Sequence, residues 1–236
     1  NADGVDAPLP GKMYVDYIRL YQDAGTGSEL YRGPAVTPGK YFGIYTEDPL
    51  ITEKLNYGAG GNAKLNFWNN ISTIKDPPPV AFEGNTVMAA NVKAGSWFGL
   101  GVAVDPGIDI SELSDGFLKF HCKTTYPGQF KVGIKSGTSA EAWIIYPAGS
   151  TQYGLERDGN WHEVVIPLSD LLAVNPSLDL AALSQPFMFS GDAPAVATSF
   201  YLDNIYFEGA GTEPAEPVIT LTAPASGSSY AAPAVI

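Results

Sequence analysis

Hydrophobic and polar residues alternate in short runs along the middle of this chain. In Trp97–Val104 every even-numbered residue is large and apolar, whereas Gly99, Gly101 and Ala103 stand between them. A period of two residues is typical of a half-buried β-strand, and Gly, Pro, Asp and Asn residues separate such runs. The pattern predicts about ten strands, at Lys40–Thr46, Lys64–Asn69, Thr86–Val92, Trp97–Val104, Phe117–Lys123, Gln129–Lys135, Ala142–Tyr146, His162–Leu168, Phe187–Phe189 and Phe200–Phe207.

Helical patterns are short and few. Only Leu168–Val174 and Leu178–Leu183 have a spacing of apolar residues that suits one or two helical turns. Many short strands without a long helix indicate an all-β fold, and we expect an antiparallel β-sandwich of the jelly-roll type.

Charge narrows the choice of partners. The 236 residues carry a net charge of -12, which argues against binding to nucleic acids or anionic membranes because both need a basic surface. No apolar segment is long enough to span a bilayer. We therefore expect no nucleic-acid or membrane partner, and a monomeric module within a larger chain.

No catalytic motif stands out in the sequence. Retaining glycosidases need two carboxylates held close together, usually on a rigid strand, whereas the acidic pairs of this chain all lie in turn-like or linker contexts. Two histidines and one cysteine form no recognisable zinc motif. Cys122 shares a strand face with Leu118 and Phe120, so a buried, unreactive thiol is predicted. We expect this segment to be non-catalytic.

Small and basic residues gather on the polar faces of three predicted strands. Gly99, Gly101 and Ala103 share a face with Trp97, and Gly133 shares one with lysines. If these strands are neighbours, they form a trough with an aromatic stacking surface, fringed by Lys119, His121, Lys131 and Lys135. Sugars bind such surfaces through an apolar ring face and their hydroxyls. The alternative is an ordinary solvated face, on which lysines keep the sheet soluble.

Other aromatic residues extend this candidate site. Trp68 lies among the amides of Asn66 and Asn70. Trp143 and Tyr146 fall on opposite faces of one strand, so one of them should be buried, and Glu141 beside Trp143 favours Trp143 as the exposed residue. The predicted carbohydrate-binding residues are Trp68, Trp97, Trp143, Tyr146, Lys119, His121, Lys131 and Lys135.

Both ends of the chain resemble pieces of other domains. Tyr14-Val15-Asp16-Tyr17, followed by Ile18-Arg19-Leu20-Tyr21, resembles the C-terminal strand of family 16 glycoside hydrolases, the laminarinases and related β-glucanases. Val218-Ile219-Thr220-Leu221 resembles the first strand of bacterial immunoglobulin-like modules. We therefore expect a remnant strand at 1–22, linkers at 23–39 and 209–217, one complete sandwich at 40–208, and a truncated module at 218–236.

Two segments of the central domain resemble β-sandwich carbohydrate-binding modules of families 4, 11 and 22. They are Gly159-Asn160-Trp161 with the following alternating strand up to Pro167-Leu168, and Phe200–Phe207. The resemblance implies that Trp161 packs in the core. It also implies a structural calcium ion, for which the candidate ligands are Glu47, Glu83 and Asp203.

Together these features predict a non-catalytic module that binds a laminarin-like β-glucan and belongs to a secreted multidomain glycoside hydrolase. A structural spacer without a ligand remains an alternative. So does a protein that binds an anionic marine polysaccharide, or cleaves one as a lyase or hydrolase, through its lysines.

Overall fold

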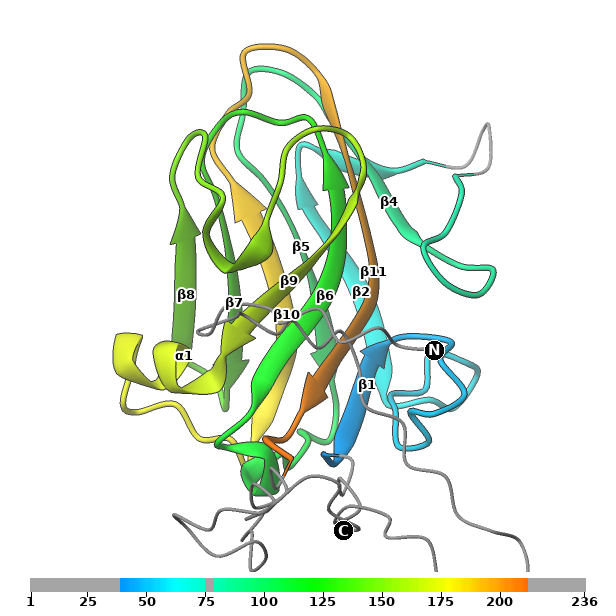
Figure 1. The fold of residues 1–236 in the computed structure, drawn as a ribbon, viewed down its shortest axis with the longest axis vertical. Coiled ribbons are helices and arrows are strands. Elements are labelled where there is room, and N and C mark those ends of the chain that lie inside the picture. Colours follow the sequence, from blue (N-terminus) through cyan, green and yellow to red (C-terminus); the bar gives the residue numbers. More distant parts are fainter. Residues whose placement is uncertain (1–38, 75–78, 212–236) are drawn as a thin grey trace, which may run out of the picture. The chain divides into compact units, whose positions relative to one another are not determined.

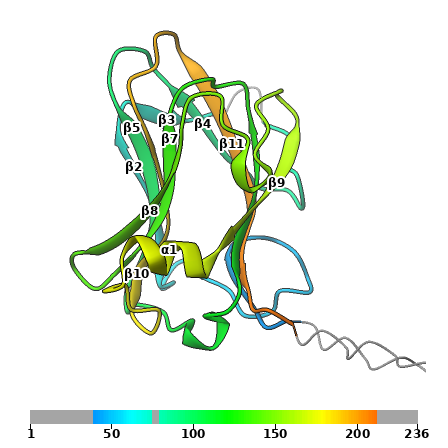
Figure 2. The same cartoon turned by 60° about the vertical axis from the view of Figure 1, so that its left-hand side comes forward.

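A computed structural model describes residues 39–74 and 79–211, which form two antiparallel β-sheets packed face to face (Figure 1). Figure 2 shows the two sheets edge-on, and the helix α1 contacts β8 and β9. The all-β sandwich is confirmed. The expectations for 1–22 and 218–236, and those for most of both linkers, lie outside the described residues.

One sheet has six strands. Its order is β3-β4-β11-β6-β9. β4 pairs with the first half of β11, and β1 pairs with the second half along the same edge. The strands are β1 (Tyr41–Tyr45), β3 (Ile71–Thr73), β4 (Met88–Val92), β6 (Phe117–Thr124), β9 (Trp161–Pro167) and β11 (Thr198–Glu208).

The other sheet has five strands in the order β2-β5-β10-β7-β8. They are β2 (Ala63–Asn69), β5 (Phe98–Val104), β7 (Phe130–Ser136), β8 (Ala140–Tyr146) and β10 (Leu183–Gly191). Helical structure in the described residues is limited to η1 (Ser111–Leu113), η2 (Gln152–Gly154) and α1 (Leu168–Val174). No helix in this part of the chain is long and apolar enough to cross a membrane.

Alternation along the strands builds the core as the sequence predicts. The even-numbered residues of β5 point inward and are almost fully buried, and aromatic rings from both sheets meet there. The Phe189 and Phe200 ring centroids are 4.8 Å apart, and those of Phe130 and Phe189 are 5.0 Å apart. Cys122 lies in this core, and burial raises the pKa of its thiol to about 12. The prediction of a buried cysteine is confirmed.

Two local predictions differ from the structure. The short strand β3 was not anticipated, and Leu178–Leu183 does not form a helix. Leu178 and Leu180 are both buried and two residues apart, which is strand-like spacing. The Ile110 amide donates a hydrogen bond to the Leu180 carbonyl at 2.8 Å, and the Ala182 amide closes a turn by donating to the Asp179 carbonyl at 3.2 Å, so tertiary pairing and a turn replace the helix.

Trp161 is not in the core. On β9 the residues Val164 and Ile166 point inward, and the period of two therefore turns Trp161 outward. It lies half-buried on the outer face of the six-stranded sheet, with ring centroids 5.9 Å from Phe82 and 6.4 Å from Tyr201.

Arg157 fastens the loops at one end of the sandwich. Its guanidinium donates to the carbonyls of Tyr126 at 2.6 Å, Gly128 at 2.7 Å and Ser150 at 3.1 Å. It also lies 4.9 Å from the Phe130 ring centroid. A charged donor that serves several backbone carbonyls fixes loops that would otherwise leave these acceptors unpaired.

Candidate functional site

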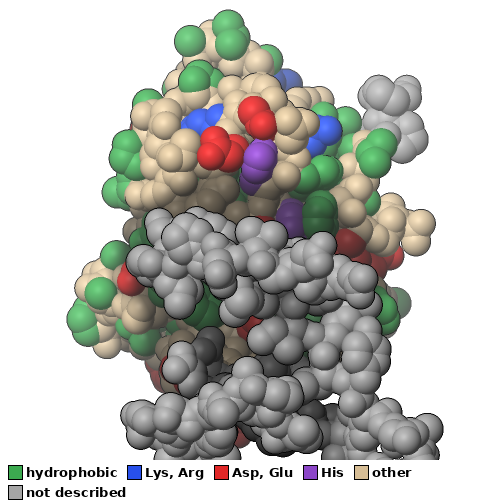
Figure 3. Space-filling view, viewed as in Figure 1, with side chains coloured by type: hydrophobic (Ala, Val, Ile, Leu, Met, Phe, Trp, Pro, Cys, Tyr) green, Lys and Arg blue, Asp and Glu red, His purple; other side chains and the backbone are tan. Residues whose placement is uncertain are grey.

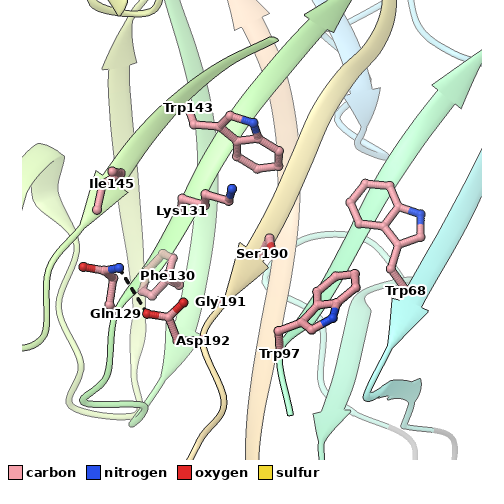
Figure 4. A pocket seen from close by; sticks show the side chains of 10 residues that line it. All are labelled: Trp68, Trp97, Gln129, Phe130, Lys131, Trp143, Ile145, Ser190, Gly191 and Asp192. Atoms are coloured by element: carbon pink, nitrogen blue, oxygen red, sulfur yellow. Dashed lines mark hydrogen bonds between the residues drawn. The ribbon is translucent and has the colours of Figure 1, made fainter. Parts of the chain in front are cut away.

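The outer face of the five-stranded sheet contains a shallow cavity of about 500 Å³ (Figure 4). We call this surface the tryptophan platform. Its lining residues come from β2, β5, β7, β8, β10 and their ends: Trp68, Trp97, Gln129, Phe130, Lys131, Trp143, Ile145, Ser190, Gly191 and Asp192.

Strand register arranges the platform in rows that run across the sheet. One row is Trp68, Gly99, Ser190, Lys131 and Ile145, and the next is Asn66, Gly101, Met188, Gly133 and Trp143. Because side chains alternate between faces, every residue in these rows points to the same outer surface. Trp68 and Trp143 stand at opposite ends of the two rows, and each has a glycine as its neighbour on the next strand.

The indole rings of Trp68 and Trp143 lie down over glycines of the neighbouring strands. A Cβ atom added to Gly101 would stand 2.5 Å from Cη2 of Trp68, and one at Gly99 would stand 2.7 Å from Cε3. A Cβ atom at Gly133 would be 2.8 Å from Cε3 of Trp143. Such distances are impossible for real Cβ atoms, so the rings take these positions only because the strands beneath carry glycine.

Met188 forms the floor between the two indoles. Its register partners are Gly101 on one side and Gly133 on the other. It is only 2% exposed although it does not belong to the hydrophobic core cluster between the sheets. The floor of the platform is therefore apolar and shielded.

Trp97 marks the open side of the platform. Its side chain is 51% exposed, the largest exposed fraction of any tryptophan in the chain. The Asn69 side-chain amide donates to the Trp97 carbonyl and to Ser96 Oγ, both at 2.8 Å. These bonds fix the turn that presents the indole to solvent.

Charged groups hold Trp143 from two sides. Its indole N–H donates to Glu141 Oε2 at 3.0 Å, and Lys135 forms a 3.0 Å ion pair with the other carboxylate oxygen. These hydrogen bonds lower the pKa of Glu141, so the carboxylate stays ionised below its usual range. The Lys131 ammonium lies 4.2 Å from the Trp143 ring centroid, within cation–π distance, and forms no salt bridge with any described residue.

The structure brings together four of the predicted residues, Trp68, Trp97, Trp143 and Lys131. Lys135 lies in the row that follows the row of Gly133 on β7. Tyr146 was placed wrongly. It is completely buried and stacks on Phe130 with a centroid distance of 4.9 Å. The alternation of β8 exposes Trp143 instead, as the neighbouring Glu141 suggested.

Lys119 and His121 were also placed wrongly. Their strand, β6, belongs to the six-stranded sheet, so both residues lie on the opposite outer face of the molecule. Lys119 forms an ion pair with Glu208. The His121 ring stacks on the Phe82 ring, with the two ring centroids 3.5 Å apart. The chain's two histidines both lie in this sheet, and the histidine side chains in Figure 3 sit beside acidic and hydrophobic ones. The trough is completed by β10, which inserts between β5 and β7.

Sequence reasoning missed the residues at the end of β10 and beside it. Ser190 and Asp192 line the platform, as does Gln129, whose amide donates to Asp192 Oδ2 at 3.1 Å. The predicted strand Phe187–Phe189 ended before Ser190 and Asp192. Nothing in the local pattern indicates that β10 lies at the centre of the sheet.

The three residues implied as calcium ligands lie near one another. Asp203 Oδ2 accepts hydrogen bonds from the amides of Phe82 and Glu83, at 2.8 and 3.3 Å. Glu83 Oε1 accepts from the amide of Glu47 and from Thr46 Oγ1, and Glu47 Oε2 accepts from the amides of the following turn. The carboxylates thus tie the loop before β4 to the residues that follow β1 and to the middle of β11.

The charges of this carboxylate cluster are not balanced within it. Burial raises the pKa of Asp203, and the nearby Glu83 adds to that rise, whereas amide hydrogen bonds lower the pKa of Glu47. In the described ranges, no three His, Cys, Asp or Glu side chains are arranged closely enough to hold a metal ion by themselves.

The glycine–indole contact can be tested without any ligand. We expect Gly101→Ala to lift the Trp68 ring from the sheet, because the new methyl group would occupy its place. Acrylamide quenching of tryptophan fluorescence should increase while the strand content measured by circular dichroism stays the same. The matched control is Gly58→Ala, whose Cβ would meet only Asn56 Oδ1 at 3.1 Å. Unchanged quenching in Gly101→Ala would contradict the packing described above.

Several solved structures resemble this one in fold. A family 30 carbohydrate-binding module of a cellulosomal cellulase from Clostridium thermocellum is 16% identical, with a TM-score of 0.47 over 73% of this chain and 93% of that chain. A family 11 module of another cellulosomal cellulase from the same organism is 18% identical, with a TM-score of 0.45 over 66% of this chain and 92% of that one. A family 11 module from that organism, in complex with a β-1,3-1,4-mixed-linked tetrasaccharide, is 17% identical, with a TM-score of 0.37 over 65% and 86% of the two chains.

No match was found among curated proteins. A family model described as "Carbohydrate binding domain 30" matches residues 48–209, which is more than half of the chain and includes the whole tryptophan platform. The chain belongs to the carbohydrate-binding domain 30 family.

Proposed function

We propose that this module binds a β-glucan on the tryptophan platform and does not cleave it. The observation that carries the proposal is the pair of indoles laid over glycines on one open sheet face. Solvent-accessible aromatic rings on a rigid strand surface suit the apolar faces of pyranose rings. The Ser190 hydroxyl and the Lys131 ammonium stand between the rings. The hydroxyl donates its proton to the Phe98 carbonyl at 2.9 Å, so it can accept a hydrogen bond from a sugar hydroxyl, whereas the ammonium can donate one.

The spacing of the indoles supports a polymeric ligand. Trp68 covers β5 and Trp143 covers β7, with β10 between them. Two strand spacings amount to about 10 Å, which is comparable with the length of a disaccharide in an extended chain. A glycan that crosses the strands can therefore stack separate rings on both indoles. Because the cavity is open, the glycan chain can continue beyond it at both of its ends.

The proposed biological role is to keep a linked catalytic domain on its polysaccharide substrate. The resemblance of residues 1–22 to laminarinases supports a parent that is a secreted multidomain glycoside hydrolase. A bound module raises the concentration of substrate at the linked active site without lowering the chemical barrier.

The aromatic residues provide the direct test. Trp68→Ala and Trp143→Ala should each weaken binding to laminarin or lichenan at least tenfold, about 1.4 kcal/mol, because each removes a stacking surface. Titration calorimetry and affinity electrophoresis measure the loss. Trp161→Ala, on the opposite outer face, is the matched control and should retain affinity. Lichenan represents the mixed-linked class of ligand found in the family 11 complex.

One observation favours a second ligand class. Lys131 lies within the platform and forms no salt bridge in the described part of the chain, so it can also hold a carboxylate or sulfate of an acidic polysaccharide. Alginate in the same titrations distinguishes the two classes. Binding of alginate but not of either glucan would replace the β-glucan proposal. Absence of binding to all three polymers would favour a spacer without a ligand.

We also propose that calcium binds at the carboxylate cluster of Glu47, Glu83 and Asp203. Backbone amides of this cluster link the three residues, because Glu83 accepts from the Glu47 amide and Asp203 accepts from the Glu83 amide, and Asp203 is almost fully buried. Calcium prefers such hard oxygen ligands, and nearby backbone carbonyls would complete its shell. When bound, the ion would neutralise the cluster and join the loop before β4 to β11.

Chelation tests the calcium proposal. At a free calcium concentration about a hundredfold above the Kd of the cluster, removal of calcium by EDTA should lower the melting temperature by about 5–10 °C. Added calcium should restore it. Asp203→Asn should lower the melting temperature and abolish the effect of EDTA. Glu156→Gln, at an exposed loop position, is the control and should behave as the wild type. A wild-type melting temperature that EDTA does not change would reject the proposal.

A further inference from the structure

A bulge in β10 places one polar side chain, that of Gln185, on the outer face of the sheet beside the tryptophan platform. Gln185 pairs with Lys135 of β7, and Met188 pairs with Gly133. Three steps along β10 thus correspond to two steps along β7, which is the signature of a β-bulge. Pro186 and Phe187 are consecutive and both buried, whereas the bulge turns Gln185 to the outer face with Met188.

The amide of Gln185 lies beside the Trp68 ring. A Cβ atom added to Gly101 would be 3.1 Å from Gln185 Oε1 and 2.5 Å from Trp68 Cη2. This oxygen is buried and accepts no hydrogen bond from any described residue. It stands at the level of the Met188 floor, next to the edge of the stacking indole.

An unpaired buried acceptor is costly to the fold. Leaving such a group unsatisfied destabilises the folded state, and native structures seldom retain one without a reason. Methionine at this position would fill similar space without the polar oxygen. The packing of the sandwich therefore gives no reason for an amide here, whereas a ligand that lies on Trp68 would bring hydroxyl groups to it.

We propose that Gln185 accepts a hydrogen bond from a hydroxyl of the sugar ring stacked on Trp68, and so determines which rings the platform selects. This inference rests on the proposed function and adds a residue to it. A site built to pair with a hydroxyl discriminates strongly against a ring that lacks it, because the buried acceptor is then left unpaired. Stacking on Trp68 alone would not make this distinction.

The test compares Gln185→Met with the same change at an exposed position outside the platform, Gln152→Met. Calorimetric titration with laminarin and lichenan should show at least a tenfold loss of affinity for Gln185→Met and less than a threefold change for Gln152→Met. Urea denaturation should show that Gln185→Met is as stable as the wild type or more stable, because an unpaired acceptor has been removed.

The outcomes separate this inference from the proposed function. Wild-type affinity in Gln185→Met, with affinity lost in Trp68→Ala, would overturn the inference alone and mean that water satisfies the amide in both states. A loss of stability that parallels the loss of affinity would also overturn it, since Gln185 would then be structural. If the wild type binds neither glucan, the proposed function fails and the inference fails with it.

Discussion

The close contact between tryptophan rings and glycine backbone determines the character of the binding face. Gly99, Gly101 and Gly133 leave no side chain above the sheet, so the indoles of Trp68 and Trp143 lie down instead of standing upright. A ring lying on a strand has little freedom and needs little further ordering when a ligand arrives. A Cβ atom at any of these glycines would collide with an indole ring, so a substitution there would change the shape of the platform.

Charged side chains, as well as packing, hold the residues around the platform in place. Glu141 links Trp143 to Lys135, and its lowered pKa keeps this link intact as the pH falls to mildly acidic values. Arg157 fixes the loops at the end of β7 through backbone carbonyls. The six-stranded sheet carries a second aromatic group around Trp161, but there Phe82 and Tyr201 pack against the indole. The two faces thus differ in what supports their tryptophan rings, which is glycine backbone on one face and other aromatic rings on the opposite face.

Local alternation predicted much of the fold and of the site. It separated the buried residues of β5 from the face of Gly99 and Gly101, and it showed that Trp143 and Tyr146 must lie on opposite sides. Strand order is set by pairing between distant segments, so it could not show that β10 separates β5 from β7 or that His121 belongs to the other sheet. The position of Gln185 depends on a single bulge, which the period of two cannot reveal.

The chain contains four tryptophans, three at the platform and one on the opposite sheet, and their indole N–H groups give separate signals in a ¹H–¹⁵N NMR spectrum. Titration with a soluble β-glucan oligosaccharide, with signals assigned by single substitutions, therefore reports directly on which face binds. Binding at the platform predicts shifts for Trp68, Trp97 and Trp143 while Trp161 stays in place. A shift confined to Trp161, or no shift at saturating ligand, would contradict this account.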